Sequence, residues 1–310
     1  MVHCQTITRL AVVSSPQRPS PFTVGVLLLV VGAVSVQLGA AIGTSVIPAI
    51  GVLGIVLARY LVQAAVHVPV AWRQLRRTSA SDWRWGLLVA VPLLSMNGSI
   101  YMAFSHIGVG LSVTIELLGP IALAAVTART WPGWVGAGLA LVGMVLVTGP
   151  TGSATGPGVV WAVVAAVSWA LYLVAVRVAG QRLPGLVPSA MASLIGLAVL
   201  VPSNLLFNAD ARLTWTVFAL AFTAGLLSSA LPYAFDMIAL RRLPMNVAST
   251  MMSLNPVMAV MWGAIILGER LGLSESVGLV IIATANVLVV RAAARARARA
   301  RAAVATATSG

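Results

Sequence analysis

The sequence predicts an all-α integral membrane protein whose chain crosses the bilayer ten times. Of its 310 residues, 60% are hydrophobic and only 8% are charged, and the mean hydropathy is +1.01. A soluble domain carries about 25% charged residues, so most of this chain has no polar coat to offer water. At about 20 residues per spanning helix, the length leaves room for ten helices with short loops and for no sizeable soluble domain.

Ten apolar runs have the length of a spanning helix. They lie at approximately 22–42, 50–69, 86–106, 109–128, 132–148, 157–178, 187–207, 214–238, 246–267 and 271–291. Residues 1–21 precede them as a cytoplasmic N-terminal segment, in which polar residues and prolines between Ser14 and Pro19 interrupt any apolar core. A cleavable signal peptide is therefore not expected, and the first helix is predicted to be a retained anchor.

The arginines predict the orientation. All 19 basic residues are Arg, and with the N-terminus inside, 16 of them fall in cytoplasmic segments. Only Arg212 and Arg270 fall outside, and Arg59 lies within a helix. This split follows the positive-inside rule and predicts a multi-pass plasma-membrane protein with both termini in the cytoplasm.

Residues 292–310 are predicted to form a disordered Arg-rich cytoplasmic tail. The arginines from Arg291 to Arg301 allow binding to RNA or to anionic lipid. Lipid is the better interpretation, because basic residues just cytoplasmic of a spanning helix gain about 1 kcal/mol each from the negative leaflet. We therefore expect no nucleic-acid partner.

The two halves of the chain resemble each other. A shift of 136 residues places 95–104 on 231–240, and a shift of 133 places 30–35 on 163–168 with five of six residues identical. We therefore expect two five-helix repeats, at 22–149 and 157–291. Because five is odd, the second repeat enters the membrane inverted, an arrangement that supports alternating access.

Prolines lie near the middle of the predicted fourth and ninth helices. Pro120 follows Gly119, and Pro256 follows Asn255. A proline inside a helix has no N–H to donate, and freed backbone at membrane depth is tolerated where protein or a water-filled cavity satisfies it. Corresponding helix breaks indicate a midplane substrate site lined by Gly119, Pro120 and Pro256; ordinary structural kinks are the alternative.

Two charged residues are predicted to lie deep in the membrane. Arg59 is about 13 Å from either end of its predicted helix, and Glu116 is the only acid at similar depth. Burying a charge there costs about 2.5–3.5 kcal/mol, so the sequence predicts an Arg59–Glu116 pair. The pair is either a substrate or proton site or a structural ion pair.

Other polar residues are weaker candidates. Asn97, Tyr172 and Asn255 lie near the midplane and either tie helices together or touch a ligand. Asp236 and Glu269 lie near helix ends, where solvation or an interfacial pair is the alternative. All five are retained as possible substrate-binding or proton-coupling residues.

Three segments carry a family resemblance: Thr114–Leu123, Ala230–Pro244, and Met252–Val260 continuing to Leu267-Gly268-Glu269. They resemble the drug/metabolite transporter superfamily, and more narrowly its inner-membrane threonine and homoserine exporters, which have two EamA domains. The resemblance implies ten helices, cytoplasmic termini and proton-coupled efflux. Asn255 stands where the family commonly has Glu, and Asp236 where close relatives have Glu, which leaves Glu116 as the main candidate proton carrier.

The predicted function is therefore secondary export of small amino acids such as threonine and homoserine, coupled to protons. Export of another small metabolite or drug is the alternative. The single Cys4 and three separated histidines argue against a metal site or an intramembrane enzyme, and the absence of Lys excludes a phosphate-binding loop. A purely structural bundle is less consistent with the paired prolines and Arg59, and no cofactor is expected.

Overall fold

The computed structural model is mainly helical in the part of the chain that it describes. The described residues are 20–128, 131–148, 156–208, 212–244, 247–248, 251, 254–267, 273–274, 276–278, 280–285 and 288. Among them no strand is formed, so the all-α prediction is confirmed. The N-terminal segment before residue 20, Glu269 and the Arg-rich tail lie outside the described residues.

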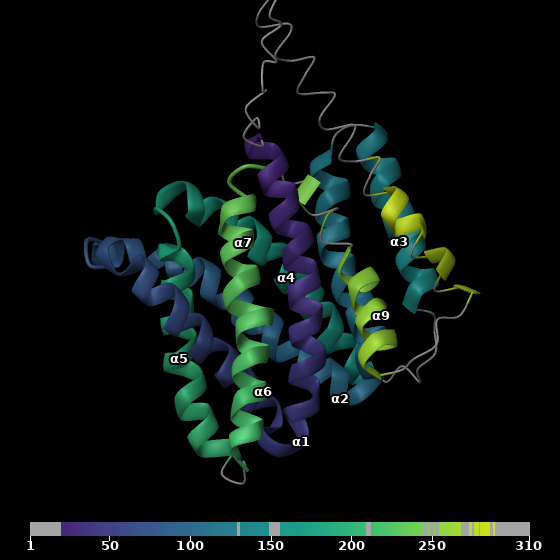
Figure 1. Ribbon diagram of the computed structural model, residues 1–310. Helices are drawn as coiled ribbons and strands as arrows, with labels where there is room; N and C mark the ends of the chain where they lie inside the picture. Colours follow the sequence, from purple (N-terminus) through teal and green to yellow (C-terminus); the bar gives the residue numbers. More distant parts are fainter. Residues whose placement is uncertain are drawn as a thin grey trace, which may run out of the picture.

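Helix α1, Pro21–Leu75, contains the first two predicted spans and is divided at Gly51. Gly51 has φ 65° and ψ 174°, a conformation essentially restricted to glycine. The break is fastened to the loop after α5, because Asn208 Nδ2 donates to the Ile50 oxygen at 2.8 Å and Arg212 N donates to the Ala49 oxygen at 2.9 Å. In Figure 1 the first segment of α1, in purple, descends to this turn.

The first span is longer than hydropathy predicts. Residues 43–49 were expected to form a loop, but the helix continues through them to the break at Gly51. Thr44 Oγ1 donates to the Ala40 oxygen at 2.9 Å, and Ser45 Oγ donates to the Ile42 oxygen at 2.7 Å. These hydroxyl groups are satisfied within the helix, so they do not interrupt it.

Helix α2, Trp83–Ala128, contains the third and fourth predicted spans. It follows a short 3-10 turn, η1, at Ala80–Asp82, whose capping box joins Ser79 and Asp82. At about 1.5 Å per residue, its 46 residues amount to roughly 69 Å of straight helix, more than twice the hydrocarbon thickness of about 30 Å. Hence α2 is long enough to hold both predicted spans.

The remaining elements follow the predicted spans closely. They are α3 at Trp131–Thr148, α4 at Gly156–Arg182, α5 at Val187–Phe207, α6 at Trp215–Gly225, a π-helical turn η2 at Leu226–Ala230, α7 at Leu231–Ala239 and α9 at Leu254–Leu267. Together α6, η2 and α7 form one helical run, Trp215–Ala239. Figure 1 shows α6 and α7 as one green column beside α1.

Five described helices are long and apolar enough to cross a membrane. They are the helical stretches Pro21–Leu75, Ala80–Ala103, Gly156–Arg182, Val187–Phe207 and Trp215–Ala239. A multi-pass membrane protein is therefore confirmed. The ten-span inverted repeat remains a prediction.

Small residues allow the helices to approach closely. A Cβ atom at Gly119 of α2 would overlap the main-chain oxygen of Ala166 in α4, and one at Gly196 of α5 would overlap the ring of Tyr60 in α1. At Gly39 of α1, a Cβ atom would come within 2.6 Å of the Ser228 nitrogen in η2. Such close backbone approach is typical of packing between membrane helices.

Candidate functional site

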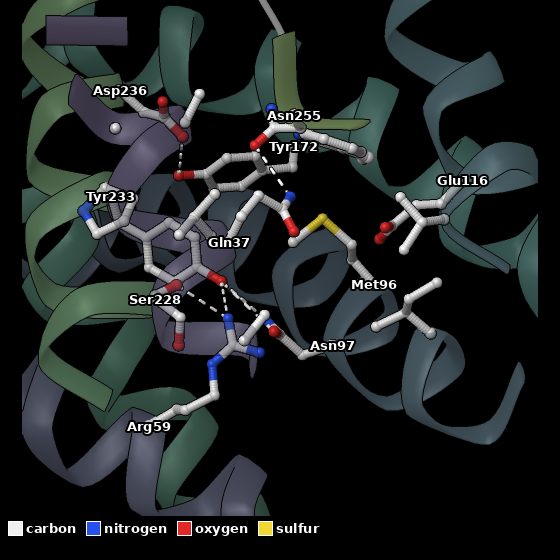
Figure 2. A pocket seen from close by; sticks show the side chains of 18 of the residues that line it. Gln37, Arg59, Met96, Asn97, Glu116, Tyr172, Ser228, Tyr233, Asp236 and Asn255 are labelled. Carbon is white, nitrogen blue, oxygen red and sulfur yellow. Dashed lines mark hydrogen bonds between the residues drawn. The ribbon is translucent and has the colours of Figure 1, made fainter. Parts of the chain in front are cut away.

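A cavity of about 110 Å³ lies among α1, α2, α4, η2, α7 and α9. Five residues selected from the sequence line it: Arg59, Asn97, Glu116, Tyr172 and Asn255, and the secondary candidate Asp236 joins them. A water molecule needs about 10–15 Å³ by a comparable measure, so the space suits a small metabolite. Figure 2 shows these polar side chains facing one another around the cavity.

The helical run Trp215–Ala239 borders the cavity, and its α-helical hydrogen bonding is interrupted at η2 and Pro232. A proline has no N–H, so the main-chain oxygen of Ser228, four residues earlier, lacks its α-helical donor. The π-helical turn Leu226–Ala230 ends two residues before Pro232 and shifts the hydrogen-bond register of the same segment. Backbone carbonyls next to the cavity therefore need partners from elsewhere.

Side chains of α1 supply these partners. Ser35 Oγ donates to the Leu227 oxygen at 2.6 Å, Arg59 Nη2 donates to the Ser228 oxygen at 3.0 Å, and His67 Nε2 donates to the Ala230 oxygen at 2.7 Å. Since a carbonyl oxygen only accepts, Nε2 of His67 carries the proton. Both segments of α1 thus supply hydrogen-bond donors to the π-helical turn η2.

Arg59 is bound entirely by uncharged groups in the described part of the chain. Its Nε donates to Ser229 Oγ at 2.9 Å, its Nη1 to the Tyr101 hydroxyl at 3.2 Å, and its Nη2 to the Tyr233 hydroxyl at 3.2 Å as well as to Ser228. Arg59 is only 7% exposed. One Nη1 hydrogen is left without an acceptor among the described residues.

Glu116 does not form the predicted contact with Arg59. No nitrogen of Arg59 lies within 4.0 Å of the Glu116 carboxylate, and no described residue donates a hydrogen bond to that carboxylate. Instead, Glu116 is buried on the α2 wall and borders the cavity, across from Arg59 in Figure 2. The carbonyl freed by Pro232 and neutral hydroxyl groups bind Arg59 instead, so the two charges share a cavity without pairing.

Two tyrosines connect Arg59 to Asp236. The ring of Tyr233 packs against the ring of Tyr172 with centroids 5.6 Å apart, and the Tyr172 hydroxyl donates to Asp236 Oδ2 at 3.3 Å. Asn97 Nδ2 donates to the Tyr233 hydroxyl at 3.1 Å. The sequence therefore selected Asn97 and Tyr172, but it did not indicate that both contact Tyr233.

Some cavity residues were missed from the sequence. Gln37 Nε2 donates to Asn255 Oδ1 at 3.2 Å, and both residues line the cavity. Ser228 and Tyr233 also line it. The run Ser228-Ser229-Ala230-Leu231-Pro232 could have indicated an irregular helix beside the site, because it places a proline inside an apolar span. Nothing in the sequence marked Gln37.

The structure places the predicted helix break at Gly119 and Pro120 away from the cavity. Gly119 and Pro120 are buried within α2, with Gly119 against α4, and neither borders the cavity. Close helix packing, rather than exposure to the cavity, therefore accounts for Gly119. Pro256 is in α9 but its side chain lies outside the described residues, as does Glu269. Among the described residues, no three His, Cys, Asp or Glu side chains gather as a metal site would require.

Comparison with known proteins identifies the family. Residues 156–291 match the EamA-like transporter family. The chain is 31% identical over 259 residues to the threonine/homoserine exporter RhtA of Escherichia coli K12, a match that covers 82% of this chain and 87% of the relative. The chain belongs to the EamA-like transporter family. It is therefore a membrane transporter, and the resemblance seen in its sequence motifs is confirmed.

Two further matches support the EamA assignment. The threonine/homoserine exporter RhtA of Salmonella typhimurium LT2 is 30% identical over 259 residues, with the same coverage of 82% and 87%. A crystal structure of a protein with 17% sequence identity has a TM-score of 0.74 and covers 87% of this chain and 98% of its own. At that identity, the structural match supports the fold alone.

Proposed function

We propose that this EamA transporter exports small amino acids such as threonine and homoserine across the plasma membrane in exchange for protons. Its similarity to the RhtA exporters over most of both chains supports this substrate class. In this proposal both termini lie in the cytoplasm. The chain forms two inverted repeats, 22–149 and 157–291, whose movement opens the cavity alternately to either side.

The chemistry of Arg59 is the observation that carries the proposal. A buried guanidinium with only neutral partners keeps a full positive charge in a medium of low dielectric constant, and Arg59 both lines the cavity and retains one unused donor. An anion that enters the cavity supplies the missing charge and accepts that hydrogen. Arg59 would therefore bind the carboxylate of the amino acid.

Glu116 supplies the complementary group. Its carboxylate borders the same cavity and has no hydrogen-bond donor among the described residues. When ionised, it would bind the α-ammonium group of the substrate, and after release it would take up a proton. Because the two cations compete for one carboxylate, export of substrate is linked to inward movement of a proton.

Transport by the purified chain tests the proposal. Proteoliposomes that contain the full-length protein should take up radiolabelled threonine and homoserine. A pH gradient with the acidic side inside the liposome should drive accumulation above equilibrium, because protons leave as the amino acid enters. Protein-free liposomes provide the background. Failure to transport either amino acid, together with transport of an unrelated metabolite or drug, would contradict the proposed substrate class.

A further inference from the structure

The cavity has a third charged residue that the carboxylate and ammonium of an amino acid do not require. Asp236 on α7 lines the cavity and is half-buried. Figure 2 shows it beyond the tyrosine pair, at the end of the cavity away from Arg59, whereas Glu116 lies on the facing wall. With Arg59 and Glu116 assigned to the two groups on the α-carbon, Asp236 is available to the side chain of the substrate.

The Asp236 carboxylate is oriented but only partly used. The Tyr172 hydroxyl donates to Oδ2 at 3.3 Å, and Oδ1 receives no hydrogen bond from any described residue. Tyr172 is 1% exposed and its ring packs on Tyr233, so its hydroxyl is held in place. This arrangement presents one carboxylate oxygen to the cavity as a fixed hydrogen-bond acceptor.

On these grounds we infer that Asp236 is the specificity-determining residue that accepts a hydrogen bond from a hydroxyl group on the substrate side chain, with Tyr172 as its positioning residue. This assignment rests on the proposed function as an amino-acid exporter. It gives the cavity three contacts with one small molecule: Arg59 with the carboxylate, Glu116 with the ammonium and Asp236 with the side chain.

A hydroxyl group suits this position better than a second ammonium group. Asp236 is half-buried and borders a cavity wide enough for water, so its charge keeps some solvation and does not require a cation. Its existing partner, Tyr172, is also a neutral hydroxyl donor. A polar site of this kind discriminates against an analogue without the hydroxyl, because the analogue leaves the acceptor unpaired.

Three amino acids on one four-carbon skeleton provide the test. Homoserine carries a terminal hydroxyl, 2-aminobutyrate carries hydrogen at that carbon, and 2,4-diaminobutyrate carries an ammonium group. Threonine is included because removal of its hydroxyl also gives 2-aminobutyrate. Binding of each to the purified full-length chain in nanodiscs is measured by isothermal titration calorimetry at one fixed pH, a measurement that requires no pH gradient.

For the wild-type chain we expect homoserine and threonine to bind about tenfold or more tightly than 2-aminobutyrate, the effect of one hydrogen bond to a charged group. Asp236→Ala should abolish this preference, and Tyr172→Phe should reduce it while leaving the carboxylate in place. Glu116→Gln is the matched control, because it should weaken all the ligands together and leave their ratio unchanged.

The outcomes separate this inference from the proposed function. If homoserine and 2-aminobutyrate bind equally to the wild type, or if their ratio survives both Asp236→Ala and Tyr172→Phe, the role of Asp236 is wrong and amino-acid binding still stands. If 2,4-diaminobutyrate is the tightest ligand and loses this advantage in Asp236→Ala, the residue is an ammonium site instead. If no amino acid binds the wild type, both proposals fail.

Discussion

Arg59 donates a hydrogen bond from Nη2 to the main-chain oxygen of Ser228 at 3.0 Å, and that oxygen is the one that Pro232 leaves without a helical donor. The same guanidinium borders the cavity where we place the substrate carboxylate. Arg59 therefore links the segment from η2 to α7 with the proposed binding site. A ligand that binds the guanidinium therefore also affects the hydrogen bond between Arg59 and the segment from η2 to α7.

This relationship predicts an energetic coupling between Arg59 and Pro232. Arg59→Lys should lower the free energy of unfolding, because one ammonium group cannot satisfy Ser228, Ser229 and both tyrosine hydroxyls at once. In a Pro232→Ala background the new N–H is available to the Ser228 oxygen, so the same substitution should cost about 0.5–1.5 kcal/mol less, the net value of one hydrogen bond. Unfolding of the four proteins in mixed micelles gives the double-mutant cycle.

Ser45→Ala provides the control for this cycle. Its hydroxyl also donates to a helix carbonyl, that of Ile42, but it lies outside the broken segment. Its effect should be the same with Pro232 and with Ala at position 232. Equal costs of Arg59→Lys in both backgrounds would show that Arg59 does not compensate for the proline.

A second prediction concerns the contact between α2 and α4. Gly119→Ala should destabilise the protein by about 1–3 kcal/mol, because the new Cβ overlaps the Ala166 oxygen and the two helices must separate. Gly98→Ala, in the same helix, adds a Cβ with no atom within 4 Å and should be neutral or stabilise by up to about 1 kcal/mol through helix propensity. Thermal unfolding midpoints of the two variants compare them directly; a shift of the same sign in both would contradict the close contact.

Hydropathy located most helices but not their internal breaks. The predicted spans 132–148, 157–178 and 187–207 correspond to α3, α4 and α5, because long apolar runs report bilayer crossing directly. The break in α1 was expected at 43–49 and is at Gly51, since hydropathy does not register whether Thr44 and Ser45 satisfy their hydroxyls within a helix.

The site shows a similar division between what the sequence indicates and what packing decides. Arg59 and Glu116 stand out in the sequence because ionisable residues are rare at membrane depth. Their partners do not, because the Ser228 oxygen is available to Arg59 only where Pro232 removes its α-helical donor and α1 packs beside it. Arg59 and Glu116 do border one cavity, but the assumption that a buried charge must pair with a charge predicted a contact that they do not make.

A third prediction concerns topology and rests on the distribution of arginine. Reporter fusions made after Thr78 and at Gly310 should report cytoplasm, and a fusion made after Gly51 should report the exterior. The reason is that, with the N-terminus inside, the segments predicted to be cytoplasmic hold 16 arginines and the predicted outer loops only two. An external C-terminus would overturn either the number of spans or the orientation.

The fourth prediction separates proton coupling from substrate binding at Glu116. Glu116→Gln keeps the size and hydrogen-bonding shape of the side chain but cannot exchange a proton. Proteoliposomes with this variant should no longer accumulate threonine in response to a pH gradient, whereas exchange of labelled for unlabelled threonine should persist at a reduced rate. Asp82→Asn is the control, because Asp82 caps η1 in an exposed turn away from the cavity and should leave coupling intact. Accumulation by Glu116→Gln that still increases with the pH gradient would assign the proton to another group, and Asp236, the second acid on the cavity wall, would be the residue to substitute next.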